Sequence, residues 1–489
     1  MSKSYPAGNG CTFLVSNAIG WERRLSVAAD GRGLVGHAGA VLLRACADRT
    51  GLTSALSEAL SRRGVPPLWD RGLVLAQLAV AIALGATSMS DIALLAHQGT
   101  LFGAPPSQAT VRRTLRPFDA VLLARIAKAR ARVRAHVWEL IATTGRGFPW
   151  LVVAGKVLTG WVVIDLDATI IESSSPKAGA AGTFKKTFGH HPLAGWCANT
   201  QECLAMLLRE GSAGSNTVAD HLEVLAACIA QIPAAYRAKL LIRVDGAGAS
   251  HGLLERIEAL NTSRRTVRYT VGWAITEADE EAITALPEQA WEAAVDQNAR
   301  VQDECHVAEL TGLDARVAGW PRGIRLIARR ARPSRRHLGK LTDLEQRTGW
   351  RYQVMATNIT RMRGVAGSQH PQFLDVLHRN HATVEDRVRG GKAMGLRNLP
   401  SKAWSVNLGW VLACNIAADL DAWTRLLGLY DHDDLARAEP DTMRYRIYHL
   451  PARLTHHAHR RWLHLPDTWP WRAAFLTCWQ RLTALPAPG

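Results

Sequence analysis

The chain has 489 residues, of which 47% are hydrophobic and 21% are charged. This composition excludes a disordered, collagen-like or coiled-coil protein and indicates a folded protein of roughly two to four domains. Lysine and arginine outnumber aspartate and glutamate by 59 − 42 = 17. Such an excess favours a polyanionic partner, a nucleic acid or an anionic membrane surface, although an arginine-rich codon usage would produce the same charge.

The eight cysteines form no CxxC pair and no zinc-ligand cluster, and we interpret them as scattered core thiols. The first ten residues lack the basic and apolar regions of an export signal, which predicts a cytoplasmic protein. The most apolar stretch, Leu73–Leu84, is shorter than the roughly 20 residues needed to cross a bilayer. We expect it to form a buried helix.

From about Val35 to Leu140 the apolar residues recur at three- and four-residue spacing, which predicts a helical region over residues 1–150. Within it, Ser107 precedes a short basic helix that can lie across a phosphate backbone, and an ordinary surface helix fits equally well. The next helix carries a series of cations, which indicates either DNA contact or a solvated flank: Arg125, Lys128, Arg130, Arg132 and Arg134.

Strand-like patterns begin at Gly160, where β-branched and apolar residues continue to Ile171 and predict a strand buried on both faces. Helices are expected from about residue 216 and over 251–260. Their alternation with strands is typical of a mixed α/β sheet. The other expected strands are 193–199, 202–208, 239–244 and 266–273.

Later in the chain the pattern changes three times. An apparent insertion has strand-like runs of its own, 324–328 and 352–356, around an arginine-rich segment. Helical periodicity then returns, and the last sixty residues or so are basic and rich in tryptophan. The predicted divisions are therefore 1–150, 151–274, 275–365, 366–430 and 431–489.

Two aspartates stand at strand positions where an unpaired carboxylate would be costly to desolvate. Asp167 lies within the apolar strand 160–171, and Asp245 ends the strand 239–244 and precedes a glycine-rich turn. Carboxylates on neighbouring strands are suitable ligands for Mg²⁺ or Mn²⁺. On the residues alone, Asp165 is an equally good first acid.

A third acid, Glu385, shares a helical stripe with His378, His381 and Lys392. A carboxylate can hold a metal ion while neighbouring cations hold the phosphates on which that ion acts. A solvent-exposed helix with salt bridges gives the same pattern. The residues leave both interpretations open.

The chain resembles the DDE-type transposases of bacterial insertion sequences, most closely the insertion-sequence family numbered thirteen-eighty, which is related to the piggyBac group. The resemblance covers nearly the whole chain. The stretches that carry it are 163–169 (VIDLDAT), 187–193 (TFGHHPL), 208–217 (LREGSAGSNT), 243–246 (RVDG), the Glu385 segment through 395–400 (GLRNLP), and 444–446 with 451–453 near the end.

The resemblance implies a ribonuclease-H-like catalytic domain, interrupted by a mostly β insertion and preceded by an α-helical DNA-binding region. It selects Asp167 over Asp165 and implies that Asp167, Asp245 and Glu385 hold two Mg²⁺ or Mn²⁺ ions. Relatives carry Tyr, Arg, Glu and Lys in the third segment, whereas this chain has His378 and His381 at the first two places.

The implied activity is binding of terminal inverted repeats, cleavage of the DNA ends and joining to target DNA by two-metal phosphoryl transfer. The implied partners are double-stranded DNA and a second copy of the chain, in the bacterial cytoplasm at the nucleoid and away from membranes. Candidate DNA contacts are Lys185, Lys186, His190, Arg209, Asn216, Arg243, His378, His381 and Lys392.

Three alternatives accompany this interpretation. The first is a catalytically silent or domesticated DNA-binding protein, against which the presence of all three acids counts. The second is a metal-dependent nuclease without strand transfer. Membrane-surface binding is a distant third, because no helix combines a basic face with an aromatic one. Relatives that form DNA hairpins need an aromatic stacking surface, for which Trp273, Trp404 and Trp410 are candidates.

Overall fold

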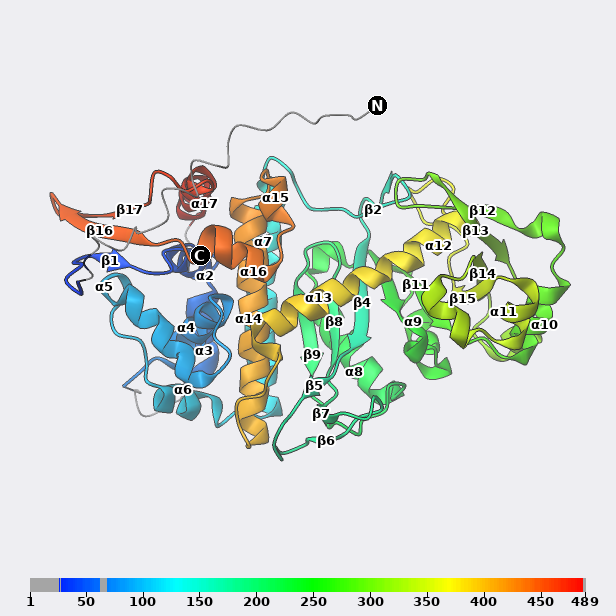
Figure 1. The fold of residues 1–489 in the computed structure, drawn as a ribbon, viewed down its shortest axis with the longest axis horizontal. Helices are drawn as coiled ribbons and strands as arrows, with labels where there is room; N and C mark the ends of the chain where they lie inside the picture. Colours follow the sequence, from blue (N-terminus) through cyan, green and yellow to red (C-terminus); the bar gives the residue numbers. More distant parts are fainter. Residues whose placement is uncertain (1–25, 27, 62–67, 487–489) are drawn as a thin grey trace, which may run out of the picture.

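The computed structural model describes residues 26, 28–61 and 68–486. The first ten residues and Cys11, on which two of the sequence predictions rest, lie outside these ranges. Helices gather at one end of the molecule and a large sheet extends to the other (Figure 1). Two long helices, α7 (Ala120–Thr143) and α14 (Trp404–Gly428), stand between them. The predicted mixed α/β fold is confirmed.

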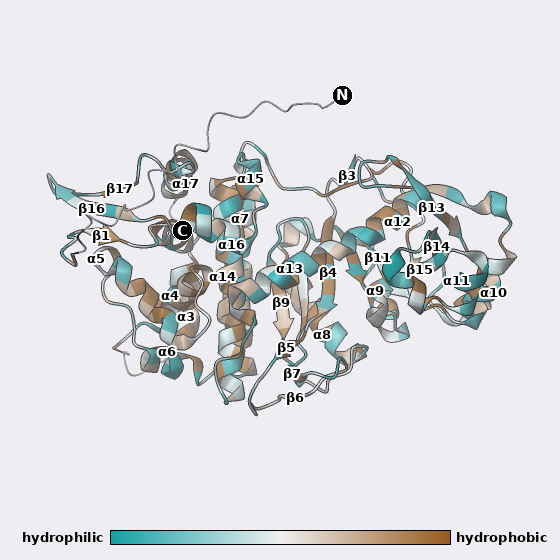
Figure 2. Ribbon diagram, viewed as in Figure 1, coloured by the Kyte–Doolittle hydropathy of each residue, from teal (hydrophilic) through white to brown (hydrophobic). Residues whose placement is uncertain are grey.

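At the helical end, side chains cap the first turns of α4 (Arg71–Ala83), α6 (Gln108–Leu115) and α7. Asp70, Ser107 and Asp119 each accept a hydrogen bond from the backbone N–H three residues further on. Helix α4 is buried along nearly its whole length, so the predicted buried helix is confirmed. Figure 2 shows apolar segments on α4 and α14. The elements are α2 (Ala40–Arg49), α3 (Leu52–Leu60), α4 (Arg71–Ala83), η2 (Met89–Gln98), α5 (Gly99–Phe102) and α6 (Gln108–Leu115).

The C-terminal elements pack against these helices rather than standing apart. Strand β16 pairs with β1 in antiparallel orientation, and α17 lies against α2 and α14. Residues 431–486 therefore share one body with the N-terminal helices. The elements are β1 (Leu34–Val35), α15 (Asp433–Ala436), α16 (Pro440–Met443), η10 (Arg444–Tyr448), β16 (Ala452–His457), β17 (Arg460–His464) and α17 (Arg472–Ala484).

Within the described residues, one nine-stranded sheet has the order β12-β13-β14-β15-β11-β10-β4-β8-β9. Strands β10 and β11 run parallel to β4. On the other side of β4, strand β8 is antiparallel to β4, and β9 is antiparallel to β8. These central strands are the predicted ones. Their bounds are β4 (Val162–Ala168), β8 (Leu193–Cys197), β9 (Cys203–Leu207), β10 (Lys239–Val244) and β11 (Thr266–Trp273).

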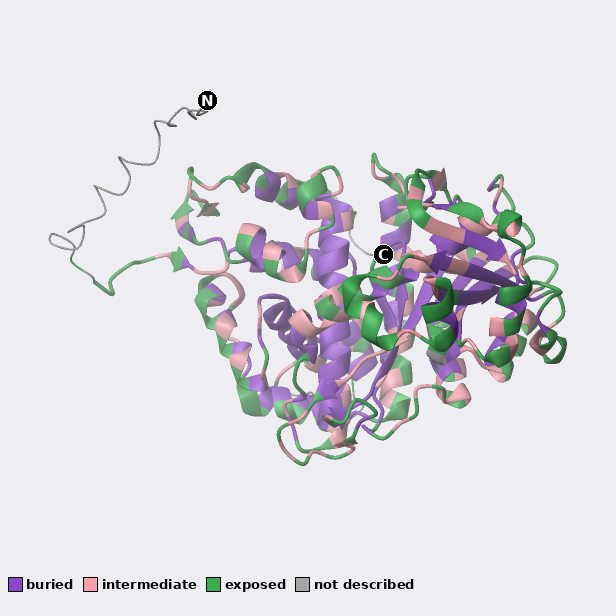
Figure 3. Ribbon diagram, turned by 45° about the vertical axis from the view of Figure 1, so that its right-hand side comes forward, coloured by how far each residue is buried: buried purple, intermediate pink, exposed green. Residues whose placement is uncertain are grey.

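Alternate residues of the central strands face two different cores, as the period of two requires. Ile164 and Leu166 join the core that includes residues of α8 (Val218–Gln231) and α9 (His251–Ala259). Val163 packs instead with apolar residues of α12 (Pro371–Arg379). Figure 3 shows the resulting burial along the strands. Helices on both faces explain why the strand sequences are continuously apolar.

The residues of the predicted insertion extend the same sheet beyond β11. Strand β15 pairs antiparallel with β11, and the other three strands follow in order. The arginine-rich segment is partly internal, because Arg329 pairs with Asp375 and Arg330 with Glu288. The elements are α10 (Glu277–Ala285), β12 (Glu292–Val295), β13 (Val301–Glu309), β14 (Arg325–Ala331), α11 (Asp343–Thr348) and β15 (Arg351–Thr357).

A buried ionic network joins the helical end to the sheet. Arg134 of α7 bonds Glu202 at 2.7 Å and Asp419 of α14 at 2.8 Å, and Arg130 also reaches Asp419. Glu202 also accepts hydrogen bonds from the indole N–H groups of two tryptophans. These arginines are therefore internal and cannot be part of the proposed DNA-contacting or solvated flank of this helix.

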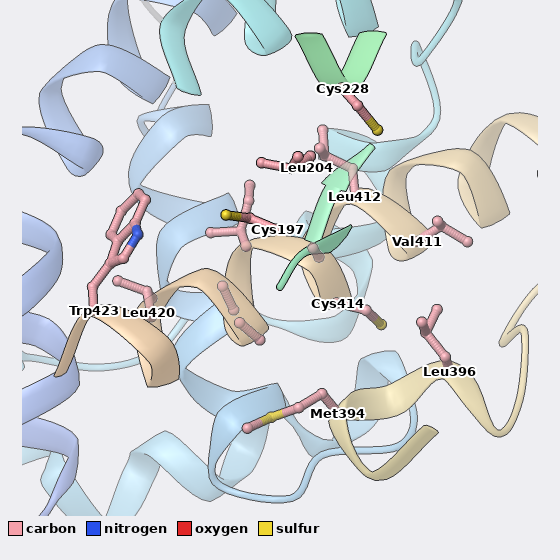
Figure 4. Packing of buried hydrophobic residues seen from close by; sticks show 14 of the residues in the cluster. Cys197, Leu204, Cys228, Met394, Leu396, Val411, Leu412, Cys414, Leu420 and Trp423 are labelled. Carbon is pink, nitrogen blue, oxygen red and sulfur yellow. The ribbon is translucent and has the colours of Figure 1, made fainter. Parts of the chain in front are cut away.

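Apolar packing surrounds this network. Figure 4 shows Leu420 and Trp423 of α14 on one side of the cluster and Cys197 and Leu204 of the sheet near its centre. The seven cysteines in the described ranges are free, and six of them are buried, as expected of core thiols, whereas Cys305 is half-buried. In these ranges no helix has the length and apolar character to cross a membrane.

Candidate active site

Two of the three predicted acids lie side by side at the carboxyl ends of two neighbouring parallel strands, β4 and β10. Arg243 is opposite Asp165 and Val244 is opposite Leu166 in the parallel pairing of β10 with β4. The next residues on the two strands are Asp245 and Asp167. Both belong to the lining of a cavity of about 170 Å³, together with Leu166, Ala168, Phe184, His191, Leu193, Ser215 and His221.

The turn after Asp245 depends on a close backbone approach. The short helix η4 (Gly246–Gly248) passes directly beside Gly272 of β11. A Cβ atom at Gly272 would meet the backbone N of Gly246 at 2.6 Å, so a side chain there would displace the turn. Gly272 thus leaves the space that the turn after Asp245 occupies.

The third acid approaches from a helix that crosses the sheet. Glu385 is exposed in the first turn of α13 (Val384–Gly391), which follows α12 after the short turn η8 (Asn380–Thr383). Burial and the nearby carboxylates of Asp245 and Glu385 together raise the pKa of Asp167 to about 6, although His381 acts in the opposite direction. All three acids are therefore electrostatic neighbours.

The fit of a metal ion can be judged from the donor groups. Among residues 26, 28–61 and 68–486, no three His, Cys, Asp or Glu side chains are spaced to hold an ion as they stand. The acids around Asp167 nevertheless form an all-oxygen donor set whose mutual repulsion a divalent cation would relieve. This chemistry suits Mg²⁺ or Mn²⁺ better than zinc.

Asp165 lies in a different environment although it is only two residues from Asp167. It is completely buried and accepts hydrogen bonds from Arg243 at 2.6 and 2.9 Å, from Arg387 at 3.0 Å and from His381 at 3.2 Å. Burial alone would raise the pKa of Asp165, but Arg243 and His381 hold it well below its usual range. Asp165 is thus an internal ion-pair residue, and Asp167 faces the cavity.

The two histidines of the helical stripe are not placed as phosphate-binding cations. Burial lowers the pKa of His378 to about 3, so this ring is neutral at physiological pH, and its Nδ1 lies 3.2 Å from Thr270 Oγ1. His381 is 7% exposed and bonded to Asp165. The DNA contacts predicted for this pair are therefore not supported.

Three further predicted DNA contacts are also internal, which corrects the sequence interpretation. His190 is fully buried, with its Nε2 3.0 Å from the Ala178 carbonyl. Arg209 donates to the His191 carbonyl and to Asp220. Arg243 is engaged by Asp165 as described above. Because all three side chains are buried, they are not accessible to a phosphate as they stand.

The remaining predicted contacts are accessible. Lys185, Lys186 and Asn216 are exposed, and Lys392 is partly buried at the end of α13. The two lysines occupy the turn between β6 (Ala181–Gly182) and β7 (Phe188–His190). Strand β7 also pairs with β5 (Ile171–Glu172), and the three strands form a separate small sheet whose residues fall between β4 and β8 in the sequence. This turn borders the acidic cavity through Phe184.

Sequence reasoning missed two residues at this site. Phe184 is 65% exposed at the cavity, and a lone phenylalanine between polar residues gives no signal of this. Arg387 falls on the helical stripe of Val384 and Val388, both of which pack toward the sheet. That spacing was a detectable signal that Arg387 points inward. Of the three tryptophans considered for stacking, Trp410 is fully buried and Trp273 is 5% exposed, whereas Trp404 is half-buried and its ring lies 6.0 Å from that of His190.

The fold and site define an α/β protein with acidic side chains gathered at the carboxyl edge of two parallel strands. The model of the family described as "Transposase DDE domain group 1" matches residues 17–487, and the chain belongs to this family. No curated protein matches the chain. It resembles the solved "Cryo-EM structure of piggyBac transposase synaptic complex with hairpin DNA" with a TM-score of 0.38 and 10% identity, over 84% of this chain and 79% of that one.

Proposed function

We propose that this transposase-family member binds the terminal inverted repeats of an insertion sequence, cleaves the DNA ends and joins them to target DNA. Asp167, Asp245 and Glu385 are its proposed catalytic acids. The observation that carries the proposal concerns three acids far apart in sequence, on β4, after β10 and on α13. Asp245 and Glu385 both raise the pKa of Asp167, and Asp167 and Asp245 line one cavity. Such clustering of like charges marks functional sites more often than structural ones.

The sheet topology supports a ribonuclease-H-like catalytic domain. Numbered along the chain, the strands β4, β8, β9, β10 and β11 lie in the spatial order 3-2-1-4-5, with the second antiparallel to the first. In this frame the first acid lies on the first strand and the second acid follows the fourth. Residues 151–274 and 366–430 would form this domain, and residues 275–365 its insertion.

In the proposed mechanism the three carboxylates would hold two Mg²⁺ or Mn²⁺ ions. When bound, such ions lower the pKa of an attacking water or DNA 3′-hydroxyl and stabilise the leaving oxygen. Asp167 and Asp245 present their carboxylates from adjacent strand ends, and Glu385 closes the site from the helix. None of the three forms a covalent bond with DNA.

Exposed cations near the cavity would hold the phosphates that flank the cut. Lys185, Lys186 and Lys392, with Asn216, are the proposed contacts. The helical end would contribute α6, on which Arg112, Arg113 and Arg116 are exposed at or just after its last turn. Such contacts would make the affinity strongly dependent on salt concentration.

We also propose the finer placement that the sequence resemblance implies. The chain would belong with the insertion-sequence family numbered thirteen-eighty and work in the bacterial cytoplasm at the nucleoid. Two copies would hold the paired ends of the element, because each end requires its own set of acids.

The test is an end-cleavage and strand-transfer assay with Mg²⁺ on DNA that carries the element's terminal repeats. We expect Asp167→Asn, Asp245→Asn and Glu385→Gln each to abolish cleavage, because each removes an anionic ligand, while the Kd for the repeat DNA stays within about twofold. Asp386→Asn is a matched control: this exposed acid is next to Glu385 and pairs only at the surface with Arg389.

The outcomes separate the alternatives. Cleavage without joining would identify a nuclease, and binding without cleavage by the unaltered protein would identify a silent DNA-binding protein. If Asp165→Asn folded normally and abolished cleavage while Asp167→Asn did not, the first acid would be misassigned.

A further inference from the structure

A buried charge network lies directly beside the three proposed catalytic acids. Asp165 is 0% exposed, and its two oxygens accept four hydrogen bonds from Arg243, Arg387 and His381. The Arg243 contact uses two guanidinium nitrogens, at 2.6 and 2.9 Å, which is the geometry of a strong charge-assisted pair. One carboxylate thus joins a neighbouring strand to the crossing helix.

Asp165, Arg243 and Arg387 each lie two residues from one of the proposed catalytic acids. Asp165 comes two residues before Asp167 on β4, and Arg243 comes two residues before Asp245 on β10. Arg387 follows Glu385 by two residues on α13. A strand repeats every two residues, so on β4 the network residue and the acid project from the same face.

Two backbone contacts extend the network. Arg243 donates from Nη1 to the Leu377 carbonyl at the end of α12, at 3.2 Å. Arg387 donates from Nη2 to the Ala198 carbonyl just after β8, at 3.3 Å. The two guanidinium groups therefore connect the segment from α12 to α13 with the strands β4, β8 and β10 of the sheet.

Apolar contact alone gives α13 little hold on the sheet. Val384 is its only buried residue within the described chain, and it packs in a small cluster with Ala194, Trp196 and Cys203. The turn η8 interrupts the α-helical hydrogen bonding just before Glu385. With so small an apolar anchor, the charge network must fix much of the position of this helix.

We propose that the Asp165 network is a clamp that sets the distance of Glu385 from Asp167 and Asp245, with Arg387 as its positioning residue on the helix. This inference rests on the proposed function, because it assigns the clamp to the spacing of those acids. Partners that orient metal ligands typically change metal affinity or activity about 10- to 100-fold when removed.

A purely structural role would give a different result, and the chain supplies a matched control. The Arg134–Glu202 pair is also fully buried, with an N–O distance of 2.7 Å. Its elements, α7 and the turn between β8 and β9, carry none of the three acids. Removing Arg134 should lower stability without changing the acid spacing.

The experiment compares Arg387→Met with Arg134→Met in the full-length protein, at a temperature well below the Tm of both. For Arg387→Met we expect cleavage to slow about tenfold or more and the Mn²⁺ concentration for half-maximal rate to rise about tenfold. Calorimetric titration with Mn²⁺ should show the same weakening without a cleavage readout. The Kd for repeat DNA should stay within about twofold, and Arg387→Lys should recover part of the Mn²⁺ affinity.

The Arg134→Met protein should lose thermal stability while it keeps the Mn²⁺ affinity of the unaltered protein. Equal Mn²⁺ affinities in the two methionine variants would overturn the clamp. If Arg387→Met does not fold, the comparison of Arg387→Lys with Arg134→Lys decides in the same way. An unaltered protein that neither binds Mn²⁺ nor cleaves DNA would instead overturn the proposed function.

Discussion

At the scale of single residues, the same side chain has opposite electrostatic properties at two nearby positions. Asp165 and Asp167 share one strand and one face, yet the pKa of Asp165 is depressed and that of Asp167 is raised to about 6. Guanidinium groups surround the first, whereas other carboxylates face the second. The charge of the neighbouring groups, and not burial alone, therefore accounts for the opposite pKa shifts of the structural acid and the proposed catalytic acid.

Phe184 offers an independent test at the same scale. Its ring is 65% exposed, lies 5.2 Å from the His191 ring and has Lys185 Nζ 5.6 Å from its centroid. An exposed ring beside cations at the cavity is suited to stack on an unpaired base, which contributes about 1–3 kcal/mol. We expect Phe184→Ala to weaken binding of a repeat duplex with a single-stranded end about fivefold or more, measured by fluorescence anisotropy.

Phe188→Ala is the matched control for this substitution. Phe188 is 43% exposed on the same hairpin but does not line the cavity. Equal losses in the two variants would mean that the hairpin itself, and not a stacking ring, supports binding.

The sequence could nominate charged residues near the site but could not separate internal from accessible ones. Arg209, Arg243 and His190 look like phosphate ligands because they flank the acids. Each is neutralised or bonded by groups that come from other elements, and for Arg243 the partner is 78 residues away. Motif resemblance selected Asp167 over Asp165, and the physical reason for that choice appears only with the pairing of β4 and β10.

At the scale of elements, periodicity predicted the central strands well because both of their faces are buried by helices. It also located β14 and β15. It could not show that these strands extend the main sheet, because pairing of β15 with β11 depends on residues such as Thr357 and Thr270 that are far apart in sequence. The strands of the insertion follow the central strands in the sequence, but they belong to the same hydrogen-bonded sheet.

The junction of α7, α14 and the sheet makes a prediction about stability. Burial alone would raise the pKa of Glu202, but Arg134 and the indole donors hold it below its usual value of 4.5. We expect Glu202→Gln to lower the free energy of unfolding by about 3 kcal/mol at pH 7, because Arg134 loses one of its two buried carboxylate partners and keeps only Asp419. Denaturant titration at several pH values measures this effect.

The sign of the pH dependence follows from the depressed pKa. A carboxylate whose pKa is lower in the folded state stabilises the fold above its unfolded pKa and loses that contribution as the pH falls through the folded pKa. The difference between the two proteins should therefore be constant above about pH 5 and shrink below about pH 4.5. Glu223→Gln, at an exposed position of α8, should change stability by no more than about 0.5 kcal/mol.

At the scale of the whole molecule, the C-terminal elements pack against the N-terminal helices. At the last turn of α4, Arg444 donates to the backbone carbonyls of Ile82 and Ala83, and the Ile82 carbonyl also accepts from the Gly85 N–H. Gly39 lies so close to the C-terminal segment that a Cβ atom there would meet the Tyr448 Cα at 2.3 Å. The sequence division at residue 430 follows composition and cannot reveal this return of the chain.

Removal of residues 431–489 should consequently unfold the helical end although all three acids remain. Without these residues the carbonyls at the end of α4 lose Arg444, and α2 loses the apolar face of α17. We expect the 1–430 protein to be aggregation-prone and to lose amide protection in α2 and α4, measured by hydrogen exchange. Co-expression of 431–489 should restore solubility, because the lost contacts are complementary surfaces and no peptide bond is required for packing. A soluble 1–430 protein with full protection in α4 would instead show that the C-terminal residues form an independent domain.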